Sequence, residues 1–200
     1  MANTWPPLMD ELTPPGRPAS VDEWLALDED DTRELVDGRL EEAEVPTAVH
    51  ELGISWLVRV VGAWLGDRGF VFASGLKLLL AAKTGRMPDA VVVLPGSKPP
   101  PPHGPLREPP DIVIEFVSPS PRDERRDRVQ KMSEYARFAV RYYWLVDPAL
   151  RTFEIFELSS AGYTQVAAAT GGTIEPVPGC PGLTLGVDAL WAELARLSVG

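Results

Sequence analysis

Three charged residues in the middle of the chain, Asp89, Glu115 and Lys131, have side chains that could act together in catalysis. Asp89 follows Pro88 at the start of an apolar run, and Glu115 interrupts the apolar run 112–117. A carboxylate in a buried strand is costly unless it is paired, hydrogen-bonded or bound to a metal. Two neighbouring carboxylates repel each other unless they share a cation. The pair therefore predicts a divalent cation held by oxygen ligands, with Mg²⁺ or Mn²⁺ as the cofactor.

Lys131 could complete such a site from the helix that we expect after the Glu115 strand. A bound metal lowers the pKa of a water molecule and stabilises charge on a phosphate, and an ammonium group can orient the water or neutralise the phosphate. Asp127 and Tyr135 lie four residues to either side of Lys131 and share its helix face. Another side of this helix is expected to face the core, and it carries Val129, Met132 and Ala136.

Other residues could extend the site. Asp111 shares the strand face of Glu115 and could be a third metal ligand, although an aspartate after proline is as easily structural. His50, at the head of a long helix, could bind a phosphate or a base. Glu34 could face the site from a hairpin or lie on the surface. Basic residues at the start of the Lys131 helix could contact a nucleic-acid backbone, and they are Arg122, Arg126 and Arg128.

Each of the three central residues also has a purely structural interpretation. Asp89 after a proline is a common turn or cap residue. Glu115 could be the buried partner of an arginine such as Arg126, and Lys131 could be an ordinary solvated lysine on a charged helix.

Cysteine and histidine are too rare to build a site of their own. Cys180 is the single cysteine, and His50 and His103 are the only histidines. These counts exclude an intramolecular disulfide and a zinc site made of Cys and His ligands. No apolar run of 18 or more residues occurs and residues 1–11 lack the blocks of a signal peptide. We therefore expect a cytoplasmic protein with no membrane span.

The net charge of −10 is unevenly distributed along the chain. Residues 1–44 contain 13 acidic and 3 basic residues, which accounts for all of it, and residues 45–200 contain 16 of each. Residues 119–151 carry eight basic against five acidic residues. A phosphate backbone responds to local basic density rather than to total charge, so DNA remains a candidate partner.

Capping and turn signals define the N-terminal elements. Residues 1–19 are proline-rich and predict an irregular leader before a single domain over 20–200. Ser20 with Glu23 forms a capping box that opens a short helix to Leu27. Asp37-Gly38 predicts the turn of a hairpin over 33–44.

The remaining chain alternates helical and strand patterns. The helices are expected at 47–65, with Thr47 as its cap, and at 123–138 and 188–197. The strands are expected at 70–82 (two short strands or one bent strand, with the bend at Gly75), 90–94, 111–117, 141–146, 152–158 and 163–168. The proline-rich segment 95–110 predicts a surface loop joining two adjacent strands. We expect a mixed α/β (α+β) domain with a central mixed sheet, flanking helices and an N-terminal helix and hairpin extension.

The ordered set of motifs resembles the Uma-type family of restriction-endonuclease-like proteins in the PD-(D/E)XK nuclease superfamily. The resemblance covers roughly residues 20–195, and its motifs are Glu34–Gly38, His50, Pro88-Asp89, Pro110–Ser120, Asp127 with Lys131, and Tyr143–Pro148. It implies a restriction-endonuclease-like fold, magnesium dependence and DNA as the substrate. By that match Asp89 and Glu115 would be the metal ligands and Lys131 the catalytic lysine.

Two positions depart from the pattern of these proteins. The superfamily's lysine usually lies two residues after the second acid, where this chain has Val117. Uma-type sequences resemble this one in carrying a lysine on the next helix, so Lys131 is the expected substitute. Ala139 stands where the family tends to have glycine, which we expect to affect only a helix end.

The sequence thus predicts a magnesium-dependent DNA endonuclease. The alternative is a catalytically inactive nuclease fold that serves as a nucleic-acid-binding or regulatory module, which Val117 and the acidic N-terminal arm favour. A homodimer is compatible with both, with the aromatic strand Tyr142–Trp144 and the hairpin at 33–44 as candidate contact surfaces.

Overall fold

The computed structural model describes residues 16–28, 31–42, 46–73, 75–118 and 125–198. Its centre is a six-stranded sheet in the order β11-β10-β9-β8-β7-β4. β8 and β9 are parallel and the other neighbours are antiparallel, so the sheet is mixed, as predicted. The strands are β4 (Phe70–Ala73), β7 (Ala90–Val93), β8 (Ile112–Phe116), β9 (Tyr142–Asp147), β10 (Thr152–Ser159) and β11 (Gly162–Ala169).

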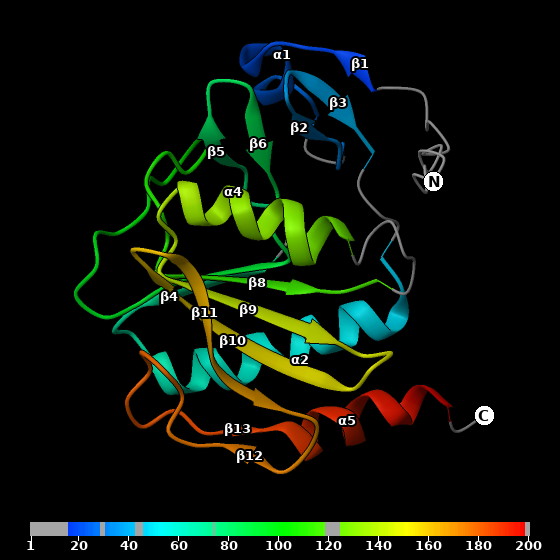
Figure 1. Ribbon diagram of the computed structural model, residues 1–200, viewed down its shortest axis with the longest axis vertical. Helices are drawn as coiled ribbons and strands as arrows, with labels where there is room; N and C mark the ends of the chain where they lie inside the picture. The colour runs from blue at the N-terminus through cyan, green and yellow to red at the C-terminus, as the bar shows by residue number, and fades with distance from the viewer. Residues whose placement is uncertain (1–15, 29–30, 43–45, 74, 119–124, 199–200) are drawn as a thin grey trace, which may run out of the picture.

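The two faces of this sheet are covered differently (Figure 1). One face packs on α2 (Ala48–Leu65), α5 (Val187–Ala195) and the small pair β12 (Thr173–Ile174) and β13 (Leu185–Gly186). A short 3₁₀ turn, Arg196–Ser198, follows α5. The other face packs on α4 (Met132–Arg137), whose Tyr135 is fully buried against Val113 and Tyr143. Val113 and Val117 lie on that second face, and Glu115 between them therefore points toward α4.

A second, five-stranded sheet lies beyond α4, in the order β1-β3-β2-β6-β5. Its strands are β1 (Arg17–Pro18), β2 (Glu34–Val36), β3 (Arg39–Glu41), β5 (Leu78–Ala81) and β6 (Thr84–Arg86), with α1 (Val21–Leu25) beside them. Trp24 of α1 is fully buried on this sheet, and a Cβ at Gly85 would lie 2.2 Å from its ring. The glycine therefore makes room for the indole.

Most of the predicted N-terminal signals are confirmed. Ser20 and Glu23 form a capping box at α1, and the Thr47 hydroxyl accepts a hydrogen bond from the His50 N–H at the start of α2. Asp37 and Gly38 have φ angles of 48° and 77°, as expected at a tight hairpin turn. Of the predicted leader, residues 1–15 lie outside the described residues, while Arg17 and Pro18 form β1.

Other predictions need correction. The two strands expected within 70–82 exist, but β4 belongs to the central sheet and β5 to the small one. The aromatic strand is wrong as a contact surface, because β9 lies between β8 and β10 and its Tyr142–Trp144 segment is buried.

The helix expected at 123–138 begins, among the described residues, as a π-helical turn η1 (Arg126–Lys131) that runs into α4. The expectation that Val129 faces the core is wrong, since its side chain is 62% exposed. The buried face is the polar one, with Asp127 at 2%, Lys131 at 5% and Tyr135 at 0% exposure. Charges can occupy this face because Glu115 meets them from the sheet.

α2 is the one described helix long and apolar enough to cross a membrane, judged by length and composition alone. A core helix of a soluble protein passes the same test. Here Leu57, Val61 and Leu65 of α2 are buried in the cluster that includes Ile112 and Ile114 of the sheet. The packing accounts for the apolar character of this helix.

Candidate active site

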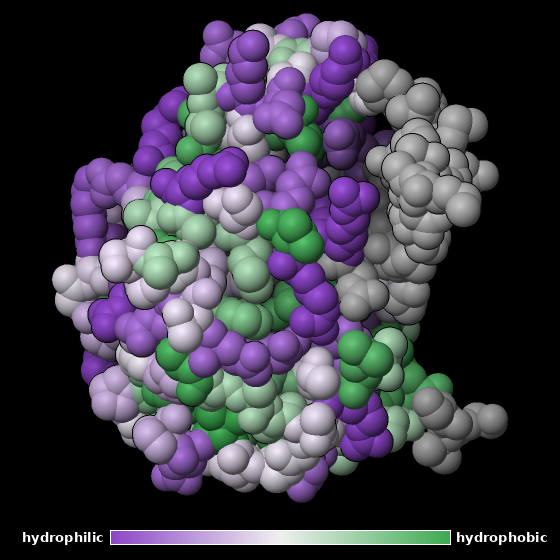
Figure 2. All heavy atoms as spheres, in the orientation of Figure 1, coloured by the Kyte–Doolittle hydropathy of each residue, from purple (hydrophilic) through white to green (hydrophobic). Residues whose placement is uncertain are grey.

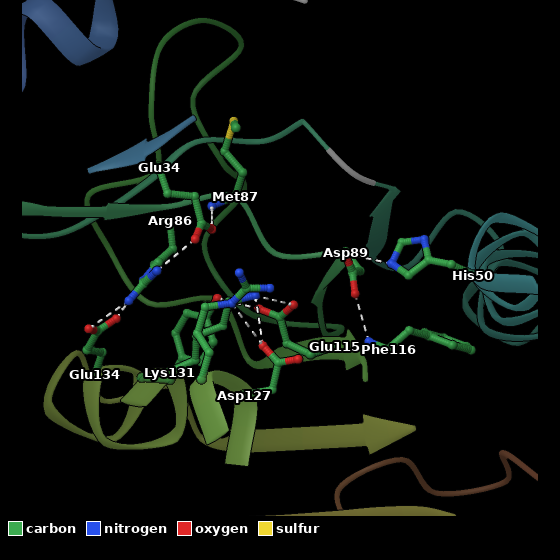
Figure 3. A network of polar contacts seen from close by, with 12 residues as sticks. Glu34, His50, Arg86, Met87, Asp89, Glu115, Phe116, Asp127, Lys131 and Glu134 are labelled. Carbon is green, nitrogen blue, oxygen red and sulfur yellow. Dashed lines mark hydrogen bonds and ion pairs between the residues drawn. The ribbon is translucent and has the colours of Figure 1, made fainter. Parts of the chain in front are cut away.

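A pocket of about 200 Å³ opens between the small sheet, the start of α2, the end of β8 and η1. Asp89, Glu115 and Lys131, which the sequence analysis selected from three separate segments, all line it (Figure 3). His50, Glu34 and Arg126 line it as well. The fold therefore gathers most of the predicted site residues around one hollow.

Asp89 and Glu115 meet across two neighbouring strands. Ala90 pairs with Ile114 in the antiparallel ladder of β7 and β8, and one further step of that register places Asp89 opposite Glu115. Asp89 Oδ2 accepts a hydrogen bond of 2.7 Å from the Phe116 N–H, and Asp89 Oδ1 lies 3.1 Å from His50 Nε2. Burial raises the pKa of Asp89, but the hydrogen bond and charge of His50 outweigh it and hold that pKa low.

Glu115 is 1% exposed, yet both of its carboxylate oxygens have partners. Oε2 accepts a hydrogen bond of 2.8 Å from Lys131 Nζ, and Oε1 accepts one of 2.7 Å from the Tyr135 hydroxyl. Burial raises the pKa of Glu115 to about 8; Lys131 opposes this rise, while the charges of Asp89 and Asp127 add to it. The site thus crowds carboxylates where negative charge is poorly solvated.

Lys131 is a buried cation rather than the solvated lysine of the alternative interpretation. Its side chain is 6% exposed, and Nζ lies 2.8 Å from Glu115 Oε2 and 3.1 Å from Asp127 Oδ1. Burial lowers its pKa, but the charges of Glu115, Glu34 and Asp127 more than compensate, so the pKa stays above its usual value. A lysine from the helix therefore reaches the second acid although Val117 stands at the superfamily's usual lysine position.

His50 lies in the first turn of α2 and faces the pocket. Its ring contacts Phe116 edge-on at 5.9 Å between centroids, and Nδ1 lies 3.2 Å from Glu51 Oε1. Burial disfavours the charged ring, but the hydrogen bond and charge of Asp89 raise the pKa of His50 to about 9. The imidazolium is thereby held against Asp89 at neutral pH.

Glu34 faces the pocket from the hairpin and is buried, so the alternative prediction of a surface position is wrong. Its Oε2 accepts a hydrogen bond of 2.7 Å from Arg86 Nη1, and its Oε1 accepts one of 2.9 Å from the Met87 N–H. Arg86, 1% exposed, also donates to both oxygens of Glu134 on α4 at 2.7 and 2.9 Å. This clamp ties the small sheet to the helix that follows Lys131 (Figure 3).

The structure does not bring Asp111 to the pocket. Its carboxylate accepts hydrogen bonds from the Leu94 N–H at 2.7 Å and the Ser97 hydroxyl at 3.0 Å, at the start of the proline-rich loop. Four residues along a strand span about 13 Å, so Asp111 and Glu115 cannot share one ion although they share a face.

The two described residues among the predicted basic contacts lie in different environments. Arg126 lines the pocket, with Nε 3.7 Å from Asp127 Oδ1. Arg128 instead donates to Asp147 at 3.1 Å and Glu154 at 2.6 Å on β9 and β10. Arg122 lies outside the described residues. The arginine-rich helix start therefore supplies one described residue to the pocket.

Comparisons with known proteins identify the family of this chain. The model of the family Uma2, described as "Putative restriction endonuclease", matches residues 21–188. The chain belongs to the Uma2 family. A search of curated proteins returned no match.

A solved structure shares the Uma2 chain's fold. It is a crystal structure of "a putative nuclease belonging to DUF820" from Anabaena variabilis ATCC 29413, with a TM-score of 0.71 at 21% identity. The alignment covers 88% of this chain and 99% of that one. The likeness confirms the predicted nuclease-like α+β fold, and the Uma2 match confirms the family to which the sequence motifs pointed.

The donor set of this Uma2 chain fits a hard divalent cation. Among the described residues no group of three or more His, Cys, Asp and Glu side chains is arranged to hold a metal ion. Asp89 and Glu115 nevertheless line the same pocket, and among the described residues each of their oxygens contacts one partner, while a carboxylate offers about four acceptor positions. Two carboxylates with water completing the shell are a normal magnesium site.

Sequence reasoning did not assign a role to Asp127, Tyr135 or Arg86. For Asp127 and Tyr135 a signal existed, namely their spacing of four residues on either side of Lys131. Arg86 gave no local signal, because its partners Glu34 and Glu134 are 52 and 48 residues away in the chain.

Proposed function

We propose that this protein is a metal-dependent nuclease that hydrolyses phosphodiester bonds in DNA, with Mg²⁺ or Mn²⁺ as its cofactor. The observation that carries the proposal is the convergence of Asp89, Glu115 and Lys131 on one pocket. The description of the Uma2 family and the nuclease-like fold support the reaction class.

Each residue has a distinct role in this proposal. Asp89 and Glu115 hold the ion, which when bound lowers the pKa of a water molecule and stabilises charge on the phosphate. Lys131 places its ammonium beside the reacting phosphate and neutralises the charge that develops there. His50, fixed by Asp89, and Arg126 lie at the same pocket and contact further phosphate oxygens.

Burial serves this chemistry. Glu115 ionises reluctantly in the pocket because burial and the neighbouring carboxylates raise its pKa to about 8. A divalent cation reverses that balance, since it is the largest local charge in such a site. In a pocket shielded from water, the attraction between the cation, the carboxylates and the phosphate is stronger than it would be in solvent.

A cleavage assay tests the proposal. Purified wild-type protein should cut single- or double-stranded DNA in the presence of Mg²⁺ or Mn²⁺. Glu115→Gln and Lys131→Met should each lower kcat by at least about 10²-fold, the usual loss when a charge-stabilising group is removed. Glu193→Gln removes a surface carboxylate from α5 and should cut like the wild type.

Two results would contradict the proposal: wild-type protein that leaves every DNA form intact with both metals, or Glu115→Gln that cuts as fast as the wild type. The first result, together with salt-dependent DNA binding, would instead support the non-catalytic nucleic-acid-binding module.

A further inference from the structure

The turn that carries Lys131 is π-helical, and it also carries a second acid, Asp127, four residues before the lysine. η1 spans Arg126–Lys131 directly before α4. Single π-turns inside helices occur often at functional sites. In this one Asp127 and Lys131 both point to the sheet, at 2% and 5% exposure, while Val129 between them is 62% exposed.

The Lys131 ammonium is held from two directions. Glu115 Oε2 on β8 lies 2.8 Å from Nζ, and Asp127 Oδ1 on η1 lies 3.1 Å from it (Figure 3). An ammonium group has three N–H donors in a fixed tetrahedral arrangement. One donor is anchored by the hydrogen bond to Glu115, while Asp127 attracts the ammonium from a second side as an ion pair rather than as a hydrogen bond. The two contacts together restrict how the ammonium can turn, so Asp127 influences where the remaining donors point.

The backbone of Asp127 is itself anchored. The Tyr143 hydroxyl on β9 donates a hydrogen bond of 3.1 Å to the Asp127 carbonyl oxygen. Tyr143 also packs on Tyr135 at 5.5 Å between ring centroids, and Tyr135 in turn donates to Glu115 Oε1. Two tyrosines thus connect the π-turn to the strand that carries Glu115, so both anchors of Lys131 are fixed to one frame.

We propose that Asp127 is a positioning residue that aims the Lys131 ammonium at the reacting phosphate, with Tyr143 fixing the backbone of Asp127. The inference rests on the proposed nuclease function for its effect on rate, and on the ion-pair geometry for its structural part. Asp127 itself touches neither substrate nor metal in this proposal; it acts through Lys131.

A double-mutant cycle with Lys131 measures this dependence. Asp127→Asn should lower kcat for DNA cleavage by about 10- to 100-fold, as loss of an orienting partner commonly does, with KM changed by less than about twofold. In the Lys131→Met background the same substitution should cost nothing further, because its target is gone. Tyr143→Phe, which retains the ring and loses only the hydroxyl, should lower kcat in the same direction and by less.

A crystal structure of Asp127→Asn supplies a readout independent of activity. Lys131 Nζ should move by more than about 0.5 Å from its wild-type place beside Glu115, which exceeds the tolerance for a working catalytic group. Far-ultraviolet circular dichroism of each variant confirms folding, and Glu193→Gln controls for the loss of one carboxylate.

Two outcomes would overturn the inference: an equal loss of kcat in both backgrounds, which would mean that Asp127 acts on its own, or an unmoved Nζ in the variant. If wild-type protein does not cleave DNA, the proposed function fails, and the Nζ position in the variant crystal then decides the positioning role by itself.

Discussion

At the scale of single residues, the pocket is a balance of buried charges. Glu115 and Lys131 form an ion pair at 2.8 Å, and Asp127 forms a second ion pair with Lys131. Asp89 faces His50 at 3.1 Å. Removing one partner of a buried pair leaves an uncompensated charge, which is more costly than replacing the whole pair. The site residues are therefore coupled, and their substitutions should affect stability as well as activity.

The His50–Asp89 pair should make stability depend on pH. The pKa of His50 is about 9 in the folded protein against 6.5 for the free side chain, so its contribution is complete below pH 6.5 and lost as pH rises through about 9. His50→Gln should lower the free energy of unfolding by about 1–2 kcal/mol at pH 6, after allowance for solvent screening.

Urea titrations at several pH values check this prediction. The difference between His50→Gln and wild type should shrink toward pH 9. His103→Gln, in the exposed proline-rich loop, serves as the matched control and should leave stability unchanged at each pH. A difference for His50→Gln that stays constant from pH 6 to 9 would contradict the pairing.

At the scale of elements, short segments distant in sequence assemble the site. Asp89 directly before β7 and Glu115 in β8 supply the two carboxylates. η1 supplies the lysine, and α2 contributes His50 from its first turn. The Glu34–Arg86–Glu134 clamp joins the small sheet to α4 and so fixes one wall of the pocket.

Arg86→Met should therefore destabilise the fold strongly. It removes the shared partner of two carboxylates, of which Glu34 has a side chain only 6% exposed, and we expect a loss of about 3–5 kcal/mol in the free energy of unfolding. Arg59→Met breaks an exposed pair with Glu193 and should cost less than about 1 kcal/mol. Chemical denaturation measures both, and similar losses in the two variants would count against the clamp.

A substitution at the end of α4 should stabilise the fold, in contrast to Arg86→Met. Ala139 has a φ of 66°, a left-handed conformation that glycine adopts without strain. Ala139→Gly should raise the free energy of unfolding by up to about 1 kcal/mol, as relief of strain exceeds the added freedom of the unfolded chain.

Ala192→Gly, at an exposed position in the middle of α5, is the matched control for Ala139→Gly. It should destabilise by about 0.5–1 kcal/mol, because a helix interior gains nothing from glycine. Thermal melts of the two variants should therefore shift in opposite directions, and a lower melting temperature for Ala139→Gly would refute the strain at the helix end.

At the scale of the whole molecule, the acidic N-terminal part supplies three of the five strands of the small sheet beside the pocket. Figure 2 shows hydrophilic residues over that sheet and across much of the same face, with apolar residues among them. Residues 1–44 hold the entire net charge of −10, so we expect the DNA of the proposed function to approach through the rest of the chain, which carries no net charge. We expect DNA affinity to be modest and to fall steeply with salt.

Local signals were sufficient to predict much of this fold from the sequence. Ser20, Thr47 and Asp37-Gly38 carry strong capping and turn chemistry, and the apolar runs of β7 and β8 read clearly as buried strands. The sequence did not predict four strands of two or three residues, which are β1, β6, β12 and β13. These strands form by pairing with other segments rather than through their local composition.

In the candidate site, too, residues with a local sequence signal were predicted, and features that depend on distant contacts were not. Asp89, Glu115 and Lys131 are conspicuous in the sequence, since a carboxylate between apolar residues requires an explanation. Burial of Asp127 and Lys131 in place of Val129 does not follow the hydrophobic pattern of the helix, because Lys131 pairs with Glu115 on a distant strand. The position of Asp111 was misjudged because a shared strand face says nothing of distance along the strand.

The most direct test of the central claim, that Asp89 and Glu115 together hold a catalytic metal, is a calorimetric titration of the protein with Mn²⁺. Wild type should bind the ion, and both Asp89→Asn and Glu115→Gln should lose the binding heat. Asp111→Asn, which alters a carboxylate directly before β8 and outside the pocket, should bind like the wild type. Absence of binding by the wild type, or equal binding by all four proteins, would contradict the account.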